Sequence, residues 1–149
     1  MVDLRKMSDE RVAEWQARLW DAYLGELIQA GYAEAVAKEN VEASKQESMS
    51  GGKLAENNFA FDIVSDGETV GVVWLFKRNV DWMIYDIEID ENHRGKGLGR
   101  RAMHAIESYV RNNGGNSIGL SVFGFNETAR TLYESEGYET IRLSVKKLL

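Results

Sequence analysis

The sequence contains neither cysteine nor proline in its 149 residues. Without cysteine the chain can form no disulfide, no thiolate metal site and no cysteine nucleophile, so its chemistry is limited to oxygen groups and imidazole. Without proline, helix ends and turns depend on glycine, asparagine, aspartate and serine, and we expect the 14 glycines to mark them.

Long apolar runs are also missing. The longest, residues 70–76, is far shorter than a membrane span, and the first ten residues have no apolar centre of the kind a signal peptide needs. Basic residues are fewer than acidic ones, 18 against 24, and the net charge of −6 argues against a protein that coats nucleic acid. We therefore expect a cytoplasmic protein with no membrane partner and no nucleic-acid partner.

What is present suits one globular domain. The length is typical of one domain, and the 44% hydrophobic content is enough for a core. Apolar residues at helical spacing predict four helices; Ser8 or Asp9 is suited to cap the first, and Asn126 is suited to cap the last. The predicted helices cover residues 8–30, 32–47, 98–113 and 126–136.

Alternating apolar residues predict five strands. They cover residues 59–64, 69–76, 81–90, 117–123 and 138–148, and residues 48–58 are predicted as a loop. The dipeptide Asp66-Gly67 favours a tight hairpin turn between the first two strands. In the last strand, Ile141, Leu143 and Val145 are expected to point inward.

The third predicted strand is irregular. Its alternation breaks between Ile84 and Ile87, as a β-bulge would cause, and bulges often lie beside active sites. The order of elements is two helices, three antiparallel strands, then helix and strand twice. This order predicts a mixed α+β fold, with helices covering a sheet that is largely antiparallel in its first half.

A glycine-rich stretch follows this strand and leads into the helix predicted at residue 98. Gly95, Gly97 and Gly99 alternate, which lets the backbone turn sharply so that several amide hydrogens point the same way. The helix N-terminus adds the positive end of its dipole. Residues 91–111 also carry five basic side chains against two acidic ones. These features predict a cradle for a phosphate-bearing ligand.

Two familiar phosphate loops do not fit this spacing. A P-loop needs Gly-Lys followed by Ser or Thr, whereas Gly97 is followed by Leu98 and Gly99. A dinucleotide fingerprint needs GxGxxG at the start of a parallel βαβ unit, whereas these glycines are evenly spaced after an antiparallel strand. The cradle therefore belongs to another kind of binding loop.

The stretch resembles the central motif of the GNAT superfamily of acetyl-CoA-dependent N-acetyltransferases. That motif is Arg or Gln, two residues, Gly, one residue, and Gly or Ala, and Arg94, Gly97 and Gly99 match it. Residues 126–138, NETARTLYESEGY, resemble the second signature of the family. The resemblance covers residues 59–149 and implies a three-layer fold around a mixed, mostly antiparallel, twisted sheet. Residues 1–58 would then be the helical, acceptor-side part of a single domain.

The resemblance also implies how acetyl-CoA would bind. Backbone amides of the cradle would hold the pyrophosphate, and the strand at Ile87 and Ile89 would pair with the pantetheine arm. Asn126 would contact this arm. Tyr133, on the same helix face, would lie near the thioester sulfur and protonate the departing thiolate. The cradle residues are Arg94, Gly95, Lys96, Gly97, Leu98, Gly99 and Arg100.

An acceptor amine arrives as an ammonium, so the reaction needs a base that acts directly or through water. Glu88, on the strand beside the cradle, is the first candidate. Asp86 and Asp90 are alternatives, because the predicted bulge hides which of the three faces the cleft. Some family members place the base on the next strand, but residues 120–125 contain no carboxylate.

The function implied is direct transfer of an acetyl group from acetyl-CoA to a primary amine in a ternary complex, since no cysteine can hold the acyl group. The acceptor would be a small-molecule or peptide amine, bound among the first two helices, the 48–58 loop and the strand near Trp82 and Tyr85. The first 56 residues carry 7 basic and 11 acidic side chains, which favours a cationic acceptor such as a polyamine, an aminoglycoside, or a lysine or N-terminal amine.

The sequence also bears on metal binding, oligomeric state and an alternative function. His93 and His104 have no metal-ligand spacing, so we expect no metal, with a packing role for His93 and a helix-surface place for His104. A homodimer is left open. The alternative function is a non-catalytic acyl-CoA sensor or partner-binding module with the same fold.

Overall fold

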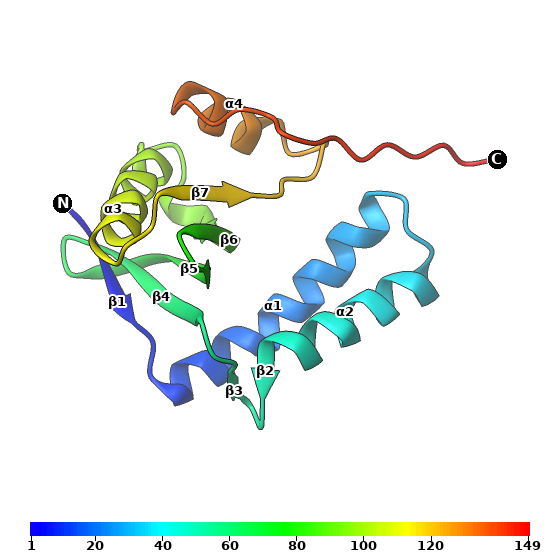
Figure 1. Ribbon diagram of the computed structural model, residues 1–149, viewed down its shortest axis with the longest axis horizontal. Coiled ribbons are helices and arrows are strands. Elements are labelled where there is room, and N and C mark those ends of the chain that lie inside the picture. Colours follow the sequence, from blue (N-terminus) through cyan, green and yellow to red (C-terminus); the bar gives the residue numbers. More distant parts are fainter.

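A computed structural model gives the backbone of all 149 residues and every side chain except that of Ser50. Five strands form one twisted sheet in the order β1-β4-β5-β6-β7 (Figure 1). Neighbouring strands are antiparallel except β6 and β7, which are parallel. The strands are β1 (Val2–Lys6), β4 (Asn58–Ser65), β5 (Glu68–Arg78), β6 (Asp81–Ile89) and β7 (Ser117–Leu120). This confirms the predicted mixed α+β fold with a mostly antiparallel sheet.

Helices cover both faces of the sheet (Figure 1). On one face lie α1 (Asp9–Gln29) and α2 (Glu34–Ser48), and on the other lie α3 (Leu98–Asn112) and α4 (Glu127–Ser135). Of the two cap candidates for the first helix, Ser8 is the cap, because its hydroxyl accepts from the Arg11 amide at 3.1 Å. The predicted cap at Asn126 is confirmed, because its Oδ1 accepts from the Ala129 amide at 3.4 Å. Each cap satisfies a backbone N–H that the first helical turn leaves unpaired.

The sheet separates two hydrophobic cores. On the α3 face, Ile63, Val73 and Leu75 are fully buried against the apolar stripe of α3. On the α1 face, Trp74 packs edge-on against Trp15 and Trp20 at ring-centroid distances of 5.6 and 5.9 Å. Alternation along β4 and β5 sends successive side chains to opposite cores, so both faces of these central strands are apolar.

Two predicted irregularities of the sheet are confirmed. Asp66 and Gly67 have φ values of +51° and +78°, the left-handed pair that a tight β4–β5 hairpin requires. In β6 the register against β5 passes from Ile84 opposite Leu75 to Asp86 opposite Trp74, so Tyr85 is the extra residue of a bulge.

Two short pieces were not foreseen. The predicted loop at residues 48–58 contains a small hairpin of β2 (Met49–Ser50) and β3 (Lys53–Leu54). The sequence analysis also gave no strand before the first helix, yet β1 pairs with the outer edge of β4. Only Val2 and Leu4 alternate with charged residues there, a pattern too short to stand out.

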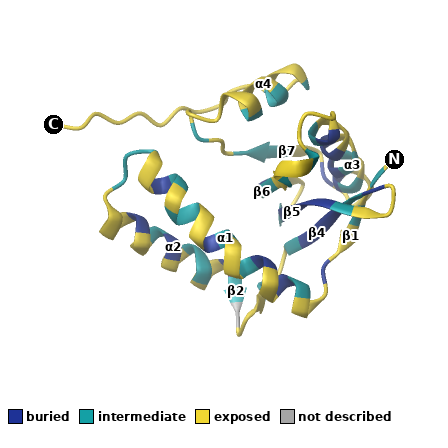
Figure 2. Ribbon diagram, turned by 180° about the vertical axis from the view of Figure 1, so that it is seen from behind, coloured by how far each residue is buried: buried dark blue, intermediate teal, exposed yellow. Residues whose placement is uncertain are grey.

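The strand predicted at residues 138–148 is wrong. The segment leaves α4 as extended chain without regular structure and projects away from the sheet (Figures 1 and 2). Ile141, Leu143 and Val145 are 96%, 78% and 90% exposed instead of buried. The alternation of apolar and polar residues is suited to a strand, but the sheet of this chain ends at β7, and the segment reaches no strand with which to pair. β7 itself is shorter than predicted, because the chain turns away after Leu120.

Candidate active site

The glycine-rich loop joins the end of β6 to the first turn of α3. A 3₁₀ turn (Glu91–His93) follows β6, and Gly97 is the N-terminal cap residue of α3. Gly95 and Gly97 have φ values of +77° and +76°, in the left-handed region that side chains other than glycine rarely adopt. A Cβ atom built at Gly95 would meet nothing within 4 Å, and one at Gly97 only the end of Arg101, so open space lies over this backbone.

Gly99 has a different role in the same loop. A Cβ atom there would lie 3.3 Å from Leu132 Cδ2, so this glycine lets α3 approach α4 closely. Leu98 is buried in the core between α3 and the sheet, so only its backbone faces the loop. The glycine pattern thus combines an open, positively polarised helix start with a tight helix–helix contact.

The basic side chains of the loop hold parts of the fold together. Arg94 Nε donates to the Ile89 carbonyl at 2.8 Å, and its Nη2 lies 3.7 Å from Glu88 Oε1. Arg100 Nη1 donates to Glu136 Oε1 at 2.7 Å and so ties α3 to α4. Lys96 is exposed. Of the predicted cradle residues, Arg100 is therefore engaged by α4, while the glycine backbone is accessible.

The two parallel strands separate beside this loop. β7 pairs with β6 only from Asp81 to Ile84, and then the chain turns into the segment that precedes α4. The β7-facing edge of β6 from Tyr85 to Ile89 is therefore open for another extended chain to pair with. Ile87 and Ile89 lie on this stretch with their side chains against the α3 core.

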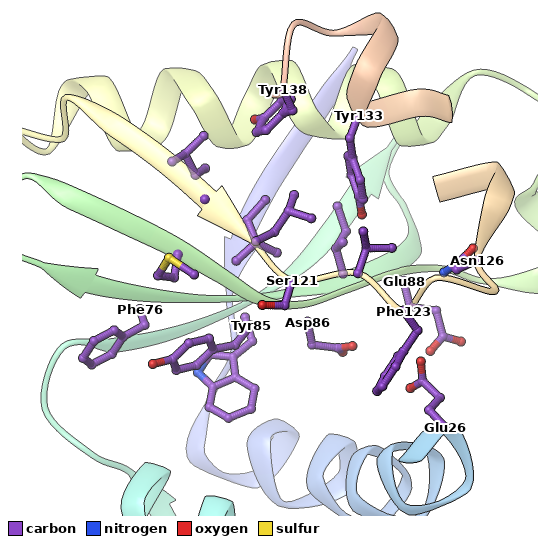
Figure 3. Close-up of a pocket in the computed structure, with 18 of the residues that line it drawn as sticks. Glu26, Phe76, Tyr85, Asp86, Glu88, Ser121, Phe123, Asn126, Tyr133 and Tyr138 are labelled. Carbon is purple, nitrogen blue, oxygen red and sulfur yellow. The ribbon is translucent and has the colours of Figure 1, made fainter. Parts of the chain in front are cut away.

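Three carboxylates converge on the opposite face of β6. The bulge places Tyr85 and Asp86 together on the α1 face, and Glu88 follows on the same face (Figure 3). Glu26 rises from α1 toward them (Figure 3). Asp90 follows β6 and lines the same cavity, but it is farther along the chain toward the loop. Asp86, Glu88 and Glu26 are the acidic cluster of this site.

Two carboxylates of the acidic cluster, Asp86 and Glu26, have raised pKa values. Burial raises the pKa of Asp86 to about 7, and the negative charges of Glu88 and Glu26 add to the rise, while the side chain of Trp15 opposes it through a hydrogen bond. Burial, followed by the charge of Glu88, also raises the pKa of Glu26. Glu88 has a side chain that is 56% exposed. Asp86 is therefore the carboxylate that exchanges its proton near neutral pH.

Tyr133 lines the same cavity from α4. Its hydroxyl points into the cavity between α4 and β6 (Figure 3). Burial raises the pKa of its phenol, and the charge of Asp86 raises it further, so the group stays protonated at neutral pH. The neighbouring ring of Tyr138, 5.9 Å away, is held by a 2.7 Å hydrogen bond from its hydroxyl to Glu107 Oε2. Asn126 lies at the start of the same helix, with its oxygen engaged as the cap.

These groups line one large cavity of about 1770 Å³. It is bounded by α1, the open part of β6, β7, α4 and the C-terminal segment. Tyr85 stacks on Phe76 at 5.2 Å and meets the edge of Trp74 at 5.1 Å, which gives the α1 side of the cavity an aromatic wall. The structure thus brings Tyr133, Asn126, Ile87, Asp86 and Glu88 to one cavity, with the cradle at the end of β6 beside it.

The sequence analysis missed Glu26 and misplaced Trp82. Glu26 follows Trp15, Leu19 and Tyr23 at helical spacing, so a carboxylate on the apolar face of α1 was the available signal. Trp82 is only 1% exposed and stacks on Phe59 in the α3 core, so its side chain lies on the face opposite the predicted acceptor pocket.

The two histidines lie as expected. His93 is largely buried, with Nε2 3.4 Å from Glu68 Oε1 across the β5 end of the sheet. His104 is exposed on α3 and lies 3.0 Å from Glu136. Among the side chains that the structure describes, no group of three or more His, Cys, Asp or Glu residues is arranged to hold a metal ion. In the same described part of the chain, no helix combines the length and apolarity needed to cross a bilayer.

The chain matches a known family in sequence and fold. The Acetyltransferase (GNAT) family model matches residues 12–138, and the chain belongs to this family. It is 28% identical over 152 residues to the uncharacterized N-acetyltransferase YdgE of Bacillus subtilis strain 168, covering 98% of this chain and 97% of that protein. The crystal structure of YycN from Bacillus subtilis aligns with a TM-score of 0.89 at 26% identity, covering 100% of this chain and 99% of that one.

YycN is also similar in sequence. It is named an uncharacterized N-acetyltransferase, and it is 31% identical to this chain over 90 residues, 58% of each protein. Family membership confirms the resemblance drawn from Arg94, Gly97 and Gly99 and from residues 126–138.

Proposed function

We propose that this protein transfers the acetyl group of acetyl-CoA directly to a primary amine that carries positive charge. The observation that carries the proposal is that Asp86, with a pKa of about 7, and a protonated Tyr133 line one cavity, and that the open glycine loop follows β6 at its end. Together these groups can remove a proton from an acceptor, donate a proton to a leaving group and bind a diphosphate.

Residues of this chain are suited to bind the pyrophosphate and the pantetheine arm of acetyl-CoA. The amides around Gly95 and Gly97 at the start of α3 would bind the pyrophosphate, because the backbone there is open and carries the positive helix end. The edge of β6 at Ile87 and Ile89, which β7 leaves uncovered, would pair with the amides of the pantetheine arm beside the contact of Arg94 with the Ile89 carbonyl, and Asn126 Nδ2 would donate to this arm. When bound, acetyl-CoA supplies the activated acetyl thioester.

Asp86 is our candidate for the base. It accepts a proton from the acceptor ammonium and leaves the amine lone pair free to attack, and a pKa of about 7 suits this role at neutral pH. Glu88, the first candidate from the sequence, is more exposed and lies beside Arg94. We give Glu88 the role of raising the pKa of Asp86 through its negative charge.

Tyr133 is the proposed acid. Its phenol donates a proton to the sulfur that leaves when the new amide bond forms. The second proton that the acylated nitrogen loses passes to solvent, and solvent restores the phenol proton. The raised pKa keeps the proton on Tyr133 until the thiolate develops. Acid and base thus lie on different elements, α4 and β6, and each holds the protonation state its task requires.

The acidic cluster also indicates the acceptor class. Glu26 and Glu88 flank Asp86, and Tyr85 offers a ring face next to them. Carboxylates and an aromatic ring attract a cation, and an acceptor with a second ammonium would pair with Glu26 or Glu88 while the first reacts. A polyamine or a lysine-rich peptide has this chemistry.

The experiment has two readouts on the same preparation. Calorimetry measures acetyl-CoA binding, and release of the CoA thiol is followed with monoamines, polyamines, an aminoglycoside and a lysine peptide. The protein adds no thiol background, because it has no cysteine. We expect binding and amine-dependent thiol release, with polyamines or the lysine peptide the best acceptors. Binding without release for every amine would instead support an acyl-CoA sensor.

A further inference from the structure

The helix that carries Tyr133, α4, has little burial of its own to hold it in place. Its nine residues, all of which the structure describes, include none that is fully buried. Helices this short are only marginally stable by themselves, so the orientation of α4 depends on its contacts with other elements. The direction of the Tyr133 hydroxyl, which points into the cavity, depends on the same contacts (Figure 3).

Three residues of α3 form a polar stripe against the end of α4. Arg100, His104 and Glu107 follow one another at spacings of four and three residues, which places them on one face of the helix. Their partners are Glu136 and Tyr138, in the chain that directly follows Tyr133. Tyr133 therefore lies immediately before the segment that ties α4 to α3.

Glu136 is the residue that most of this stripe contacts. Its Oε1 accepts from Arg100 Nη1 at 2.7 Å and lies 3.0 Å from His104 Nε2, and its side chain is only 15% exposed. The hydrogen bond with His104, more than the one from Arg100, lowers the pKa of Glu136, so the carboxylate stays charged at neutral pH. A hydrogen bond between a guanidinium and a carboxylate is strong and directional, so Glu136 fixes the end of α4 on α3.

The same segment is bonded to Tyr133 through the backbone. The amides of Glu136 and Tyr138 both donate to the Tyr133 carbonyl, at 3.1 and 3.0 Å. The Tyr138 ring lies 5.9 Å from the Tyr133 ring, and its hydroxyl donates to Glu107 Oε2 at 2.7 Å. The backbone and the ring of Tyr133 are thus held by residues that α3 in turn holds.

Glu136 also determines which partner Arg100 has. Arg100 is one of the residues predicted to form the phosphate cradle, yet its guanidinium is bonded to the end of α4, with Nη1 on Glu136 and Nη2 donating to Ser135 Oγ at 3.0 Å. Because opposite charges cancel at short range, this pair presents less positive charge to a phosphate than a free guanidinium would.

We propose that Glu136 is a positioning residue for the acetyl transfer. It ties α4 to α3 so that the Tyr133 phenol stays at the leaving sulfur, and it restrains Arg100, which when free would bind a phosphate of acetyl-CoA more strongly. This role rests on the proposed function of Tyr133 as the acid. Loss of Glu136 should therefore have opposite effects on turnover and on acetyl-CoA affinity.

Glu136→Ala is the first test. We expect kcat to fall by about 10-fold, because a small displacement of a catalytic group lowers the rate steeply. Calorimetry should show acetyl-CoA binding at least as tight as in the parent. An unchanged kcat, or a fall in kcat together with weaker acetyl-CoA binding, overturns the proposal, since the second result is what general damage to the fold would cause.

Two further variants serve as matched controls. Glu136→Gln keeps an oxygen that can accept from Arg100, so its kcat should lie within about threefold of the parent. Glu127→Ala removes a carboxylate from the exposed first turn of α4 and should leave kcat and acetyl-CoA affinity near those of the parent. A loss in Glu127→Ala equal to that in Glu136→Ala would mean that any charge removed from α4 has this effect, which overturns the proposal.

The double variant Tyr133→Phe with Glu136→Ala shows whether Glu136 acts through the phenol. Where the phenol is already absent, removal of Glu136 should lower kcat no further, because residues that act as a unit are not additive. If Glu136→Ala lowers kcat by the same factor with and without the Tyr133 hydroxyl, Glu136 does not act through it and the proposal is wrong.

Hydrogen exchange gives an answer that needs no turnover. The amides of residues 130–138 should exchange faster in Glu136→Ala than in the parent, while those of β4 and β5 stay protected. Unchanged exchange of residues 130–138 would overturn the proposal even in an inactive protein. A parent without amine-dependent thiol release would instead contradict the proposed function, and the exchange result would still decide whether Glu136 holds α4.

Discussion

The Tyr133 phenol and the Asp86 carboxylate face the same cavity from α4 and β6, and burial first and the charge of Asp86 second raise the pKa of Tyr133. Burial also raises the pKa of Asp86, to about 7. One group therefore holds its proton at neutral pH while the other exchanges it. Groups with separated pKa values in one cleft are the arrangement that general acid and general base catalysis requires.

Replacing Tyr133 by phenylalanine removes the proposed proton donor and keeps the ring. We expect kcat to fall by ~10²-fold, the lower end of the usual range for loss of an acid, because a thiolate is a fairly good leaving group. Acetyl-CoA affinity should change little. Tyr109→Phe is the control, since Tyr109 packs against Phe61 and Trp82 in the α3 core and is not among the residues that line the cavity. Equal turnover in the two variants would remove Tyr133 from the mechanism.

Asp86 should lower the stability of the protein as the pH rises. Its pKa is about 7 when folded and about 3.9 when unfolded, so between these values the folded state binds the extra proton. Stability from this group therefore falls from about pH 4 to about pH 7 and is level above. Asp86→Asn removes this loss, so its gain in Tm over the parent should be larger at pH 8 than at pH 5. A gain independent of pH would contradict the raised pKa.

Gly97→Val should weaken acetyl-CoA binding by at least about tenfold, because the side chain would fill the open space over the cradle and strain a left-handed backbone. Gly114→Val is a matched control. Gly114 has a φ of +87° and open surroundings, but it lies at the other end of α3. Because the two substitutions introduce similar backbone strain, only the loss of the cradle should distinguish them. Calorimetry should therefore show weaker acetyl-CoA binding for Gly97→Val than for Gly114→Val. Equal affinities would mean that the loop does not bind the pyrophosphate.

Glu26→Gln should raise KM for a polyamine by roughly 2–5-fold, from the ~0.5–1 kcal/mol of a partly exposed ion pair. KM for a monoamine should change less, because its one ammonium is deprotonated at Asp86. Glu42→Gln on α2, where Glu42 faces Lys45 at 3.7 Å, provides the control. If Glu26→Gln affects both amines equally, Glu26 does not select for a second charge.

The local signals in the sequence predicted most of the fold. The apolar stripes of α1 and α3, the caps at Ser8 and Asn126 and the turn at Asp66-Gly67 are set by neighbours along the chain, so they could be recognised without tertiary information. The C-terminal segment shows the limit of such signals. Its alternation indicates a strand, but whether a strand forms depends on an available partner edge, which no local pattern contains.

Only part of the candidate site could be predicted from the sequence, again because local patterns do not contain tertiary packing. The glycine pattern is local and located the cradle. The choice among Asp86, Glu88 and Asp90 depended on the phase of the bulge, which is set by pairing between Trp74 and Asp86 and between Leu75 and Ile84. Glu26 joins the acidic cluster only through the packing of α1 on the sheet. The raised pKa of Asp86 arises from that packing and from two other residues, so no local motif could predict it.

The pH dependence of kcat/KM in the parent and in Asp86→Asn, measured with the best amine, decides whether Asp86 is the base. We expect the parent rate to rise with pH through a step near pH 7 and to level off, because only ionised Asp86 accepts the proton. In Asp86→Asn the step should vanish and the rate should fall by ~10²–10⁴-fold, with acetyl-CoA affinity retained. A parent profile without a step between about pH 6 and pH 8, or the same step in Asp86→Asn, would contradict the assignment of Asp86 as the base.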